Sequence, residues 1–330
     1  MPNIELLKKK VFTLSGEEEF NKLALDVFRF QFENNQIYRQ YVQCLNRKED
    51  SVKHYSEIPF LPIEFFKSFK VVSGAVDEAW VFSSSGTTGI ATSKHYVKEL
   101  ALYEKSFLTS FVQFFGRPEK YVILGLLPSY LERKGSSLVY MVQKLIDLSA
   151  YSESGFYLDE YKKLQTLLKR LKEQNIPVIL FGVSFALMEM AEQFPVNFPE
   201  LIIMETGGMK GRRKELVREE LHSLLKKAFG VEKIYSEYGM TELLSQAYSK
   251  GNGIYQAPPW MKILIRDVND PFCFLNENKT GGVNVIDLAN LYSCSFIETQ
   301  DLGKKRSNGF FEILGRFDHS DVRGCNLLVV

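Results

Sequence analysis

The sequence predicts an α/β protein with a mostly parallel sheet, followed by a smaller, mostly β part toward its C-terminal end. Before about Gly251, short apolar runs alternate with stretches of helical periodicity. After this point, shorter alternating segments replace the helical pattern. A β-α-β-α order is typical of a parallel sheet covered by helices.

The composition is that of an ordinary globular protein. The chain has 330 residues, 45% of them hydrophobic and 25% charged, with a formal net charge of +1. A chain of this length buries enough surface to form a core without disulfides or a structural metal. General nucleic-acid and anionic-membrane binders use a strong excess of positive charge, which is missing here. We therefore expect no nucleic-acid partner.

Cysteine spacing and hydropathy bear on the compartment. The cysteines lie far apart without zinc-like spacing, so we expect reduced thiols at Cys44, Cys273, Cys294 and Cys325. Charged residues near the N-terminus precede any long apolar run, which argues against a secretory signal and predicts a cytoplasmic protein. The longest apolar stretch, residues 178–188, is too short to span a bilayer.

Residues 1–57 are expected to form a helical entry segment. Within it, residues 17–41 place phenylalanines and leucines among charged residues at a spacing closer to helical than alternating. Residues 58–72 follow, and Pro59 and Pro62 interrupt any helix there. We expect an extended, aromatic-rich connector that packs against the rest of the protein.

An α/β core is expected over residues 58–250 and a smaller β-rich subdomain over residues 251–330. In the core, residues 79–82, 121–127 and 178–181 are each typical of a short buried strand that turns into a helix. Residues 159–174 carry leucines at helical spacing. In the subdomain, strands are expected at residues 260–265, 283–288 and 310–314.

A hydroxyl-rich glycine loop follows the first core strand. It reads Ser83, Ser84, Ser85, Gly86, Thr87, Thr88 and Gly89. Glycines let successive N–H groups converge and hydroxyls add donors, a combination that suits a polyphosphate. It is not a Walker A loop, because no Gly-Lys-Ser/Thr follows. An exposed polar turn explains most clusters of this composition.

A second polar segment ends the apolar run that begins at Ile234. It contains Tyr238, Gly239, Met240, Thr241 and Glu242. A flat ring can stack on a purine, a threonine hydroxyl can contact phosphate, and a carboxylate can hold Mg²⁺. Taken alone, Glu242 is better explained as a carboxylate at the start of a helix.

A third segment, residues 299–303, places Asp301 in an expected turn. A carboxylate there can accept hydrogen bonds from the two hydroxyls of a ribose. Taken alone, a simple turn residue is the commoner explanation.

Each polar segment was considered alone above, but four motifs occur together in a fixed order, which favours a functional interpretation. The motifs are SSSGTTG, YGMTE, TQDLG and LGRFDHSDVRG. Together they resemble the core motifs of the adenylate-forming superfamily, which includes acyl-CoA synthetases, nonribosomal-peptide adenylation domains and firefly-type luciferases. Within it, the chain most resembles the acyl-protein synthetase branch of the bioluminescence fatty-acid reductase system, and more distantly phenylacetate-CoA ligase. The branch likeness rests on IPFLPIEFFK, LPSYLERKGSSLVYM and ETGGMKG.

The resemblance implies the fold of the large N-terminal domain of adenylate-forming enzymes, with ATP and Mg²⁺ as cofactors. The loop over the β and γ phosphates of ATP would consist of Ser84, Ser85, Gly86, Thr87, Thr88 and Gly89. Gly207 and Gly208 would lie along the base, Tyr238 would stack on the adenine, and Asp301 would hold the ribose. Gly239 would also belong to the nucleotide site, and Arg316 would contact the ribose or a phosphate. Thr241 would touch the α-phosphate, Glu242 would hold Mg²⁺, and Asp318 would lie at the domain hinge.

The sequence departs from the larger relatives after this hinge. They continue into a lid domain whose lysine assists adenylation, whereas this sequence ends at Val330, so we expect the lid to be absent. Either a partner protein supplies the missing cation, or Lys94, Lys210 or another residue substitutes for it, or the adenylation rate is low.

In the acyl-protein synthetase branch, the acyl group passes to a cysteine close to the C-terminus and then to a partner reductase. Cys325 occupies a comparable place, and a thiolate is a competent nucleophile toward an acyl-adenylate. The alternative for Cys325 is a small buried hydrophobic residue, and the other three cysteines are expected to be structural.

Two further patterns carry less weight. Gly182-Val183-Ser184 begins like the nucleophile elbow of a hydrolase, but the next two residues do not complete it, so hydrolysis is set aside. A basic run is typical of a solvated helix start, with docking of an acidic carrier protein as the alternative; it comprises Lys210, Arg212, Arg213 and Lys214.

Three functions remain open. The first is ATP-dependent activation of a carboxylic acid, fatty by branch likeness, as an acyl-adenylate that acylates a protein thiol. The second is transfer of the acyl group to CoA or an acyl carrier protein. The third is a catalytically silent scaffold for a reductase or synthase.

Overall fold

A computed structural model describes residues 3–75, 80–84, 92–128, 135–207 and 216–317. The helices are α1 (Ile4–Val11), α2 (Glu17–Asn34), α3 (Gln36–Cys44), α4 (Phe65–Ser68), α5 (Leu100–Phe115), α7 (Ser137–Leu148), α8 (Tyr161–Glu173), α9 (Ser184–Gln193) and α10 (Arg218–Phe229). The strands are β1 (Leu61–Pro62), β2 (Trp80–Ser83), β3 (Lys94–Val97), β4 (Val122–Leu126), β5 (Gly155–Phe156), β6 (Val178–Val183), β7 (Ile202–Thr206), β8 (Tyr235–Tyr238), β9 (Ala247–Ser249), β10 (Ile254–Gln256), β11 (Met261–Arg266), β12 (Thr280–Asp287), β13 (Phe296–Lys305) and β14 (Phe311–Arg316).

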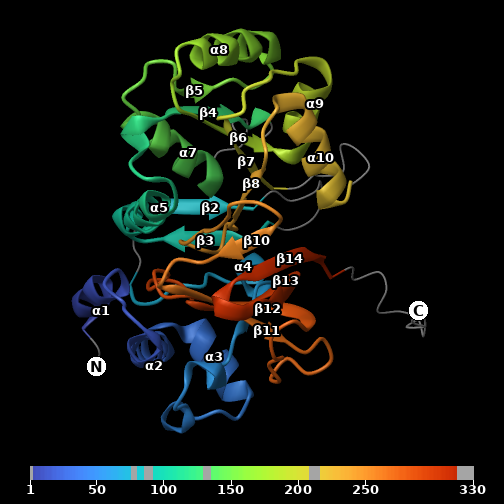
Figure 1. Ribbon diagram of the computed structural model, residues 1–330. Helices are drawn as coiled ribbons and strands as arrows, with labels where there is room; N and C mark the ends of the chain where they lie inside the picture. The colour runs from blue at the N-terminus through green and yellow to red at the C-terminus, as the bar shows by residue number, and fades with distance from the viewer. Residues whose placement is uncertain (1–2, 76–79, 85–91, 129–134, 208–215, 318–330) are drawn as a thin grey trace, which may run out of the picture.

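One continuous path of hydrogen-bonded strands runs through both halves of the molecule (Figure 1). Its order is β11-β12-β13-β14-β10-β9-β8-β7-β6-β4-β5, and β1 adds in parallel to β13. Neighbouring strands from β4 to β8 are parallel, whereas the pairs from β8 onward through β9 to β14 are antiparallel. The predicted α/β class is confirmed, and the β-rich tail continues the same sheet.

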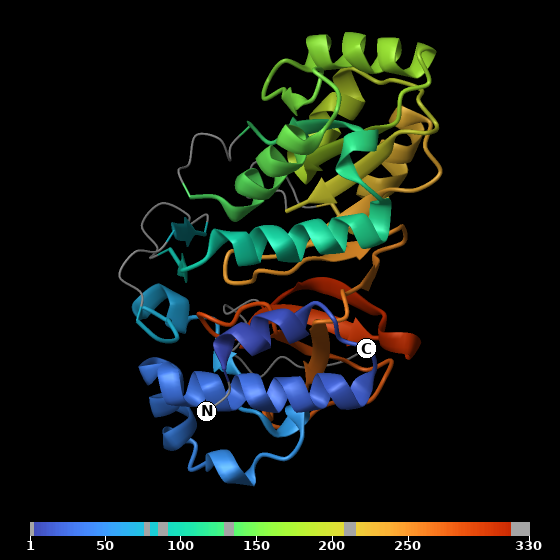
Figure 2. The same cartoon turned by 90° about the vertical axis from the view of Figure 1, so that its left-hand side faces the viewer.

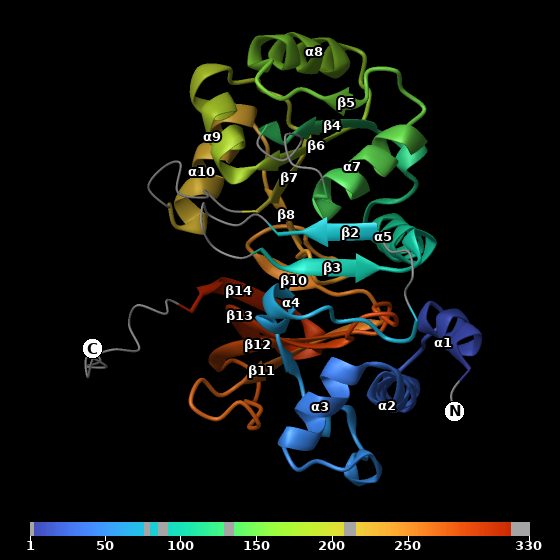
Figure 3. The same cartoon turned by 180° about the vertical axis from the view of Figure 1, so that it is seen from behind.

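The parallel strands form the half shown at the top of Figure 1. Every residue of β4 and β6 is buried, because helices lie on both sides of these strands. Helices α5 and α7 pack together on one side and α9 and α10 on the other (Figures 1 and 3). The strands expected at residues 121–127 and 178–181 and the helix expected at 159–174 are confirmed as β4, β6 and α8. β6 runs on through Gly182, and α9 begins directly at Ser184.

The antiparallel strands form the other half, and the N-terminal helices pack on them. Figure 2 shows α1 and α2 side by side along this half. The ring of Phe28 in α2 meets Phe296 of β13 edge to face. The expected helical segment at residues 17–41 is two helices, because Asn35 ends α2 and its side chain caps α3 by accepting from the Tyr38 N–H. The strands expected at 260–265, 283–288 and 310–314 are confirmed as β11, β12 and β14.

The strand expected at residues 79–82 differs from the prediction. It is β2, which pairs antiparallel with β3 in a separate two-stranded sheet, and no helix separates the two strands in the described part of the chain. Trp80 is 50% exposed, so this is not a buried strand of the parallel sheet; only Phe82 points into the core. Figure 3 shows the β2–β3 hairpin beside α5, between the two halves.

The connector at residues 58–72 is also only partly extended. Two residues form β1 beside β13, and one helical turn, α4, follows. Both prolines precede that turn, so they do not prevent it. Within the described ranges, no helix combines the length and apolarity needed to cross a membrane.

Candidate active site

The candidate site lies where the carboxyl end of β8 meets strands of two other sheet regions. In parallel sheets, ligand sites form beyond the carboxyl ends of the strands, because the loops and free backbone groups gather there. Here Tyr238 ends β8 and contacts β13, while Thr241 follows it and contacts β3. Three segments far apart in the sequence therefore meet at one place.

Asp301 lies in the interior of β13, so its expected placement in a turn is wrong. It stands opposite Arg316 of β14 in the strand register, and the Arg316 Nε donates to its Oδ1 at 3.1 Å. The Tyr238 hydroxyl donates to its Oδ2 at 2.8 Å. The Asp301 carboxylate is thus almost buried and held from both sides, whereas the Arg316 side chain is 77% exposed.

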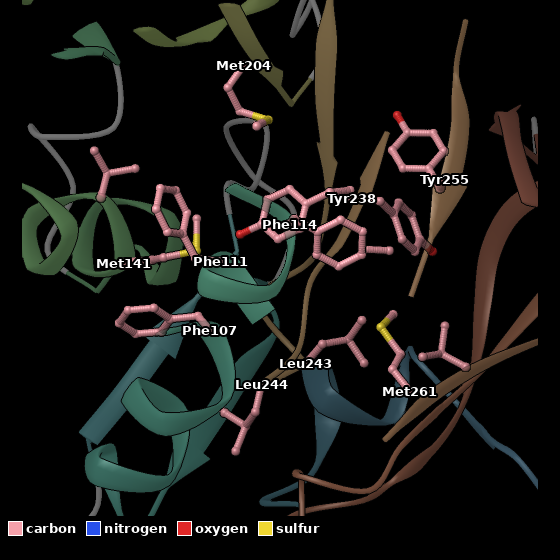
Figure 4. Packing of buried hydrophobic residues seen from close by; sticks show 14 of the residues in the cluster. Phe107, Phe111, Phe114, Met141, Met204, Tyr238, Leu243, Leu244, Tyr255 and Met261 are labelled. Carbon is pink, nitrogen blue, oxygen red and sulfur yellow. The ribbon is translucent and has the colours of Figure 1, made fainter. Parts of the chain in front are cut away.

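Most of the Tyr238 ring packs in the core beside Tyr255 (Figure 4). Its other aromatic neighbour is Phe311. Tyr238 is 8% exposed. Burial and the neighbouring Asp301 carboxylate raise the pKa of its hydroxyl, so the phenol stays protonated and can donate. The structure brings Tyr238 and Asp301 together, and stacking of the ring on adenine remains a prediction.

Thr241 and Glu242 lie in a turn between β8 and β9, so the alternative that Glu242 begins a helix is wrong. Glu242 is 4% exposed. Burial raises the pKa of its carboxyl group, and a hydrogen bond from the Ser93 side chain opposes that rise. The Thr241 carbonyl is 2.8 Å from Nδ1 of His95 in β3.

The base of the hydroxyl-rich loop adjoins this turn. Ser84 and Ser93 close the base, because the Ser84 N–H donates to the Ser93 carbonyl at 3.1 Å and the Ser93 N–H donates to the Ser84 hydroxyl at 2.9 Å. Ser93 also reaches Glu242. The exposed Lys94, one candidate for the missing cation, comes next in the chain and stands opposite Ser83.

Several predicted site residues lie outside the described residues. They are Ser85, Gly86, Thr87, Thr88, Gly89, Gly208, Lys210, Asp318 and Cys325. Of the other cysteines, Cys294 is buried as expected of a structural residue, whereas Cys44 and Cys273 are exposed. All three are free thiols, as predicted.

Ser184 does not have the partners of a hydrolase nucleophile. Its hydroxyl donates to Glu205 Oε1 at 2.7 Å and to the Gly207 carbonyl at 2.9 Å. Nε2 of His222 faces the other oxygen of Glu205 at 3.2 Å, so the carboxylate separates serine from imidazole. Burial alone would raise the pKa of Glu205, but hydrogen bonds from His222 and Ser184 lower it. The cluster holds the Gly207 carbonyl just after β7 and leaves Ser184 without an imidazole base.

The surroundings of Glu242 fit a magnesium ion that is shared with a nucleotide. Among the described residues, no three His, Cys, Asp or Glu side chains cluster as a self-contained metal site. Mg²⁺ keeps several waters and needs only one or two protein carboxylates when phosphates supply its other ligands. Glu242 is one nearly buried carboxylate whose charge is weakly compensated, which is the donor that such a site requires.

Sequence reasoning missed four residues that contact this site. Ser93 and His95 follow the hydroxyl-rich loop, Asp287 ends β12, and Asn290 lies in the loop after it. All four are buried. One signal for the last two was available, because Asp287 and Asn290 interrupt an apolar run from Val283 to Leu291 without forming an obvious turn.

The fold is that of adenylate-forming enzymes. It is similar to ATP-bound MatB from Rhodopseudomonas palustris, with 16% identity, a TM-score of 0.55, and coverage of 75% of this chain and 50% of MatB. It is also similar to 2-hydroxyisobutyryl-CoA ligase in complex with 2-HIB-AMP and CoA, with 11% identity, a TM-score of 0.64, and coverage of 92% and 71%. MenE from Bacillus subtilis, an O-succinylbenzoate coenzyme A synthetase in complex with AMP, aligns at 18% identity and a TM-score of 0.53, with coverage of 75% and 51%. The chain spans about half the length of MatB and MenE.

A comparison with models of sequence families assigns the chain to one family within this class. The family profile of LuxE, acyl-protein synthetase, matches residues 5–330. The chain belongs to this family, which confirms the branch resemblance drawn from its motifs. A comparison with curated proteins finds no match.

Proposed function

We propose that this protein uses ATP to convert a carboxylic acid, a fatty acid by family likeness, into an acyl-adenylate and passes the acyl group to a protein thiol. One observation supports this most directly: Tyr238, Asp301 and Arg316 meet beside the Thr241–Glu242 turn and the base of the hydroxyl-rich loop. Membership of the LuxE family supports the same activity.

Described residues at the site offer contacts to the ribose and the phosphates of ATP. Asp301 would accept hydrogen bonds from the ribose hydroxyls, since each carboxylate oxygen keeps a free lone pair beside its bond to Tyr238 or Arg316. Arg316 is exposed enough to turn toward a phosphate. Thr241 would meet the α-phosphate with its hydroxyl, because His95 engages only its carbonyl.

Glu242 would hold Mg²⁺ together with the phosphates and water. The ion would offset phosphate charge as pyrophosphate leaves. The site around Glu242 excludes bulk water, so the attraction between the carboxylate and a cation is stronger than at an exposed surface.

The first reaction needs positioning more than acid–base catalysis. A carboxylate oxygen of the acid attacks the α-phosphorus in line, the P–O bond to the β-phosphate breaks, and pyrophosphate leaves. No proton moves in this step, because the carboxylate is already ionised. The protein's part is orientation and charge stabilisation.

The second reaction transfers the acyl group to sulfur. A thiolate attacks the acyl carbon, the thioester bond forms, the bond to AMP breaks, and the thiol proton goes to solvent. We assign the receiving thiol to Cys325. A buried residue is unsuited to that role, and burial raises the pKa of the Cys294 thiol to about 12, so Cys294 is not the acceptor.

The test is a screen for acid-dependent exchange of labelled pyrophosphate into ATP, using straight-chain acids of increasing length and aromatic acids. We expect exchange with a subset of the aliphatic acids. In a second arm, labelled acid and ATP should give a hydroxylamine-sensitive acylated protein that Cys325→Ser abolishes and Cys273→Ser preserves. Thioester formation only after addition of CoA or an acyl carrier protein would favour those acceptors. Nucleotide binding without exchange for any acid would favour a silent scaffold.

A further inference from the structure

The turn that carries Thr241 and Glu242 has no regular secondary structure, yet buried side chains hold its backbone. His95, Asp287 and Asn290 are at most 1% exposed and contact residues 241–245. We call these three residues the polar cradle. Buried polar groups are costly unless fully bonded, so a cradle under this turn requires an explanation.

Asp287 binds one end of the segment. Its Oδ2 accepts from the Leu244 and Ser245 N–H groups at 2.8 and 2.9 Å. Its Oδ1 accepts from the Ser245 hydroxyl at 2.6 Å and from the Ala289 N–H at 3.2 Å. Both carboxylate oxygens are therefore fully used inside the protein, and Asp287 is not available to a ligand.

Asn290 and His95 bind the other end. The Asn290 amide donates to the Glu242 carbonyl at 2.8 Å and to the Cys294 carbonyl at 2.9 Å. These two acceptors fix the orientation of the amide, so its Oδ1 faces Nε2 of His95 at 3.0 Å. Nδ1 of the same ring lies 2.8 Å from the Thr241 carbonyl oxygen. Both ring nitrogens therefore face acceptor oxygens, and the neutral imidazole, which carries one N–H, donates to one of them at a time. The backbone of the turn is thus supported by a chain of side-chain contacts, from His95 in β3 to Asn290 in the loop after β12.

The same strand connects the turn to the hydroxyl-rich loop. Ser93, two residues before His95, closes the loop base against Ser84 and hydrogen-bonds to the Glu242 carboxylate. Ser93 therefore contacts the Glu242 side chain, and His95, on the same strand segment, contacts the Thr241 backbone. The described base of the loop and the turn share this segment as a support.

We propose that the polar cradle positions the Thr241–Glu242 turn for ATP and Mg²⁺, and that His95 ties this turn to the strand segment that carries Ser93. The three residues are positioning residues, since their polar atoms contact protein groups. Because the role is directed at ATP and Mg²⁺, it depends on the proposed function.

Two substitutions of His95 separate its contact with the Thr241 carbonyl from its contact with Asn290. Asn places its amide nitrogen near the position of Nδ1, so His95→Asn keeps the bond to the Thr241 carbonyl. Gln places its amide nitrogen near the position of Nε2, so His95→Gln keeps only the bond toward Asn290. His54 is distant from the turn and bonds to Ser56, so His54→Asn is the matched control.

The experiment is calorimetric titration of the full chain with ATP, once with EDTA and once with Mg²⁺. The readout is the factor by which Mg²⁺ tightens ATP binding, and thermal unfolding checks that each variant is folded. We expect His95→Gln to reduce this factor at least fivefold, while affinity in EDTA changes less than twofold. We expect His95→Asn to keep at least half of the factor and His54→Asn to keep all of it. Asp287→Asn, which presents an amide to two N–H groups, should behave like His95→Gln.

The outcomes are distinct. A wild-type Mg²⁺ factor in folded His95→Gln and Asp287→Asn overturns the inference and leaves the proposed function intact. Equal loss of affinity with and without Mg²⁺ also overturns it, because that pattern reports general loosening. If His95→Gln is unfolded, the same criteria are applied to the Mg²⁺ factors of His95→Asn and Asp287→Asn. A wild-type chain that does not bind ATP overturns the proposed function and the inference with it.

Discussion

The two halves of the molecule build their share of the candidate site in different ways. The parallel half places residues just beyond the end of a strand, as at Thr241 and Glu242 after β8. The antiparallel half places Asp301 in the middle of a long strand, opposite Arg316 on the next strand. A residue beyond a strand end needs support from elsewhere, whereas a residue within a strand is positioned by the hydrogen bonds of the sheet itself.

Both halves also bury polar side chains. In the parallel half, β4 and β6 are buried apolar strands, and Ser184 and His222 are buried as well. The antiparallel half buries Asp287 and Asn290. These two side chains bond to the backbone of the turn after β8, where the hydrogen bonds of a sheet are missing.

The largest effect is expected for Glu242→Gln, which removes the charge at the strand end and keeps the shape. We expect acid-dependent pyrophosphate exchange to fall about 100- to 1000-fold, as for loss of one electrostatic contact to the transition state. Exchange assays at several Mg²⁺ concentrations measure it. Glu277→Gln, an exposed site on the β11–β12 loop, is the control. Unchanged pyrophosphate exchange in Glu242→Gln would show that the Glu242 carboxylate takes no part in the reaction.

A core substitution tests how the parallel half is stabilised. Leu180→Ala in β6 should lower the free energy of unfolding by about 3 kcal/mol, because a fully buried side chain is lost and a cavity remains. Leu314→Ala in β14 should cost less than about 0.5 kcal/mol, because Leu314 is half exposed. Denaturant unfolding measures both. Similar losses at the two positions would contradict the burial of Leu180 in β6 and the exposure of Leu314 in β14.

We expect the carboxyl group of Glu237, the residue before Tyr238, to make the stability of the protein depend on pH. Burial raises the pKa of its carboxyl group from 4.5 to about 7, opposed by a hydrogen bond from Thr206. The folded state therefore binds the proton more tightly than the unfolded state. Stability from this group is complete below pH 4.5 and is lost as the pH rises through 7, by a total of roughly 3 kcal/mol.

Glu237→Gln removes this dependence. The difference in thermal midpoint between pH 5 and pH 8 should be smaller in the variant than in the wild type. Burial lowers the pKa of His95 to about 4, which costs stability as the pH falls below 6.5, but this contribution is common to both proteins and cancels. Parallel pH profiles for the two proteins would show that Glu237 is ionised in the fold.

The smallest effect is expected within the antiparallel strands. Asp301→Asn should raise the KM for ATP roughly 10- to 100-fold, because hydrogen bonds to a charged group contribute about 1.5–3 kcal/mol. Tyr238→Phe keeps the ring and removes the hydroxyl that orients Asp301, so a smaller rise is expected. Steady-state exchange kinetics measure both, with exposed Asp270→Asn as the control. Equal effects of the two variants would mean that Asp301 acts only through Tyr238.

Strong periodicity is what made parts of the fold predictable. β4, β6 and α8 have uniform apolar runs or regular leucine spacing, and they form where expected. Asp301 was misplaced because its neighbours include Gly303, which is typical of a turn. In the structure Gly303 sits inside β13, where a Cβ atom would lie 2.6 Å from Val283 Cγ2 and 2.8 Å from the Glu312 carbonyl oxygen. The glycine serves close strand contact there.

The candidate site was only partly predictable for a different reason. Tyr238, Thr241, Glu242 and Asp301 stand in recognisable motifs, so their types and order suggested a nucleotide. The partners of His95 are Thr241 and Asn290, both far along the chain, and no local pattern announces such pairings. Similarly, hairpin geometry of β2 and β3 depends on strand pairing across the loop between them, which composition does not encode.

The pairing of β1 with β13 has a consequence for synthesis of the protein. Leu61 stands beside Ile297, so the N-terminal helices cannot complete their packing until more than two hundred further residues have left the ribosome. At about 5–20 residues per second, this delay is on the order of 10–50 seconds. During that interval Phe28 and Tyr38, which finally pack on Phe296, lack their partner. Nascent chains stalled before residue 296 should therefore bind ribosome-associated chaperones strongly. The chaperones should dissociate when β13 emerges from the ribosome.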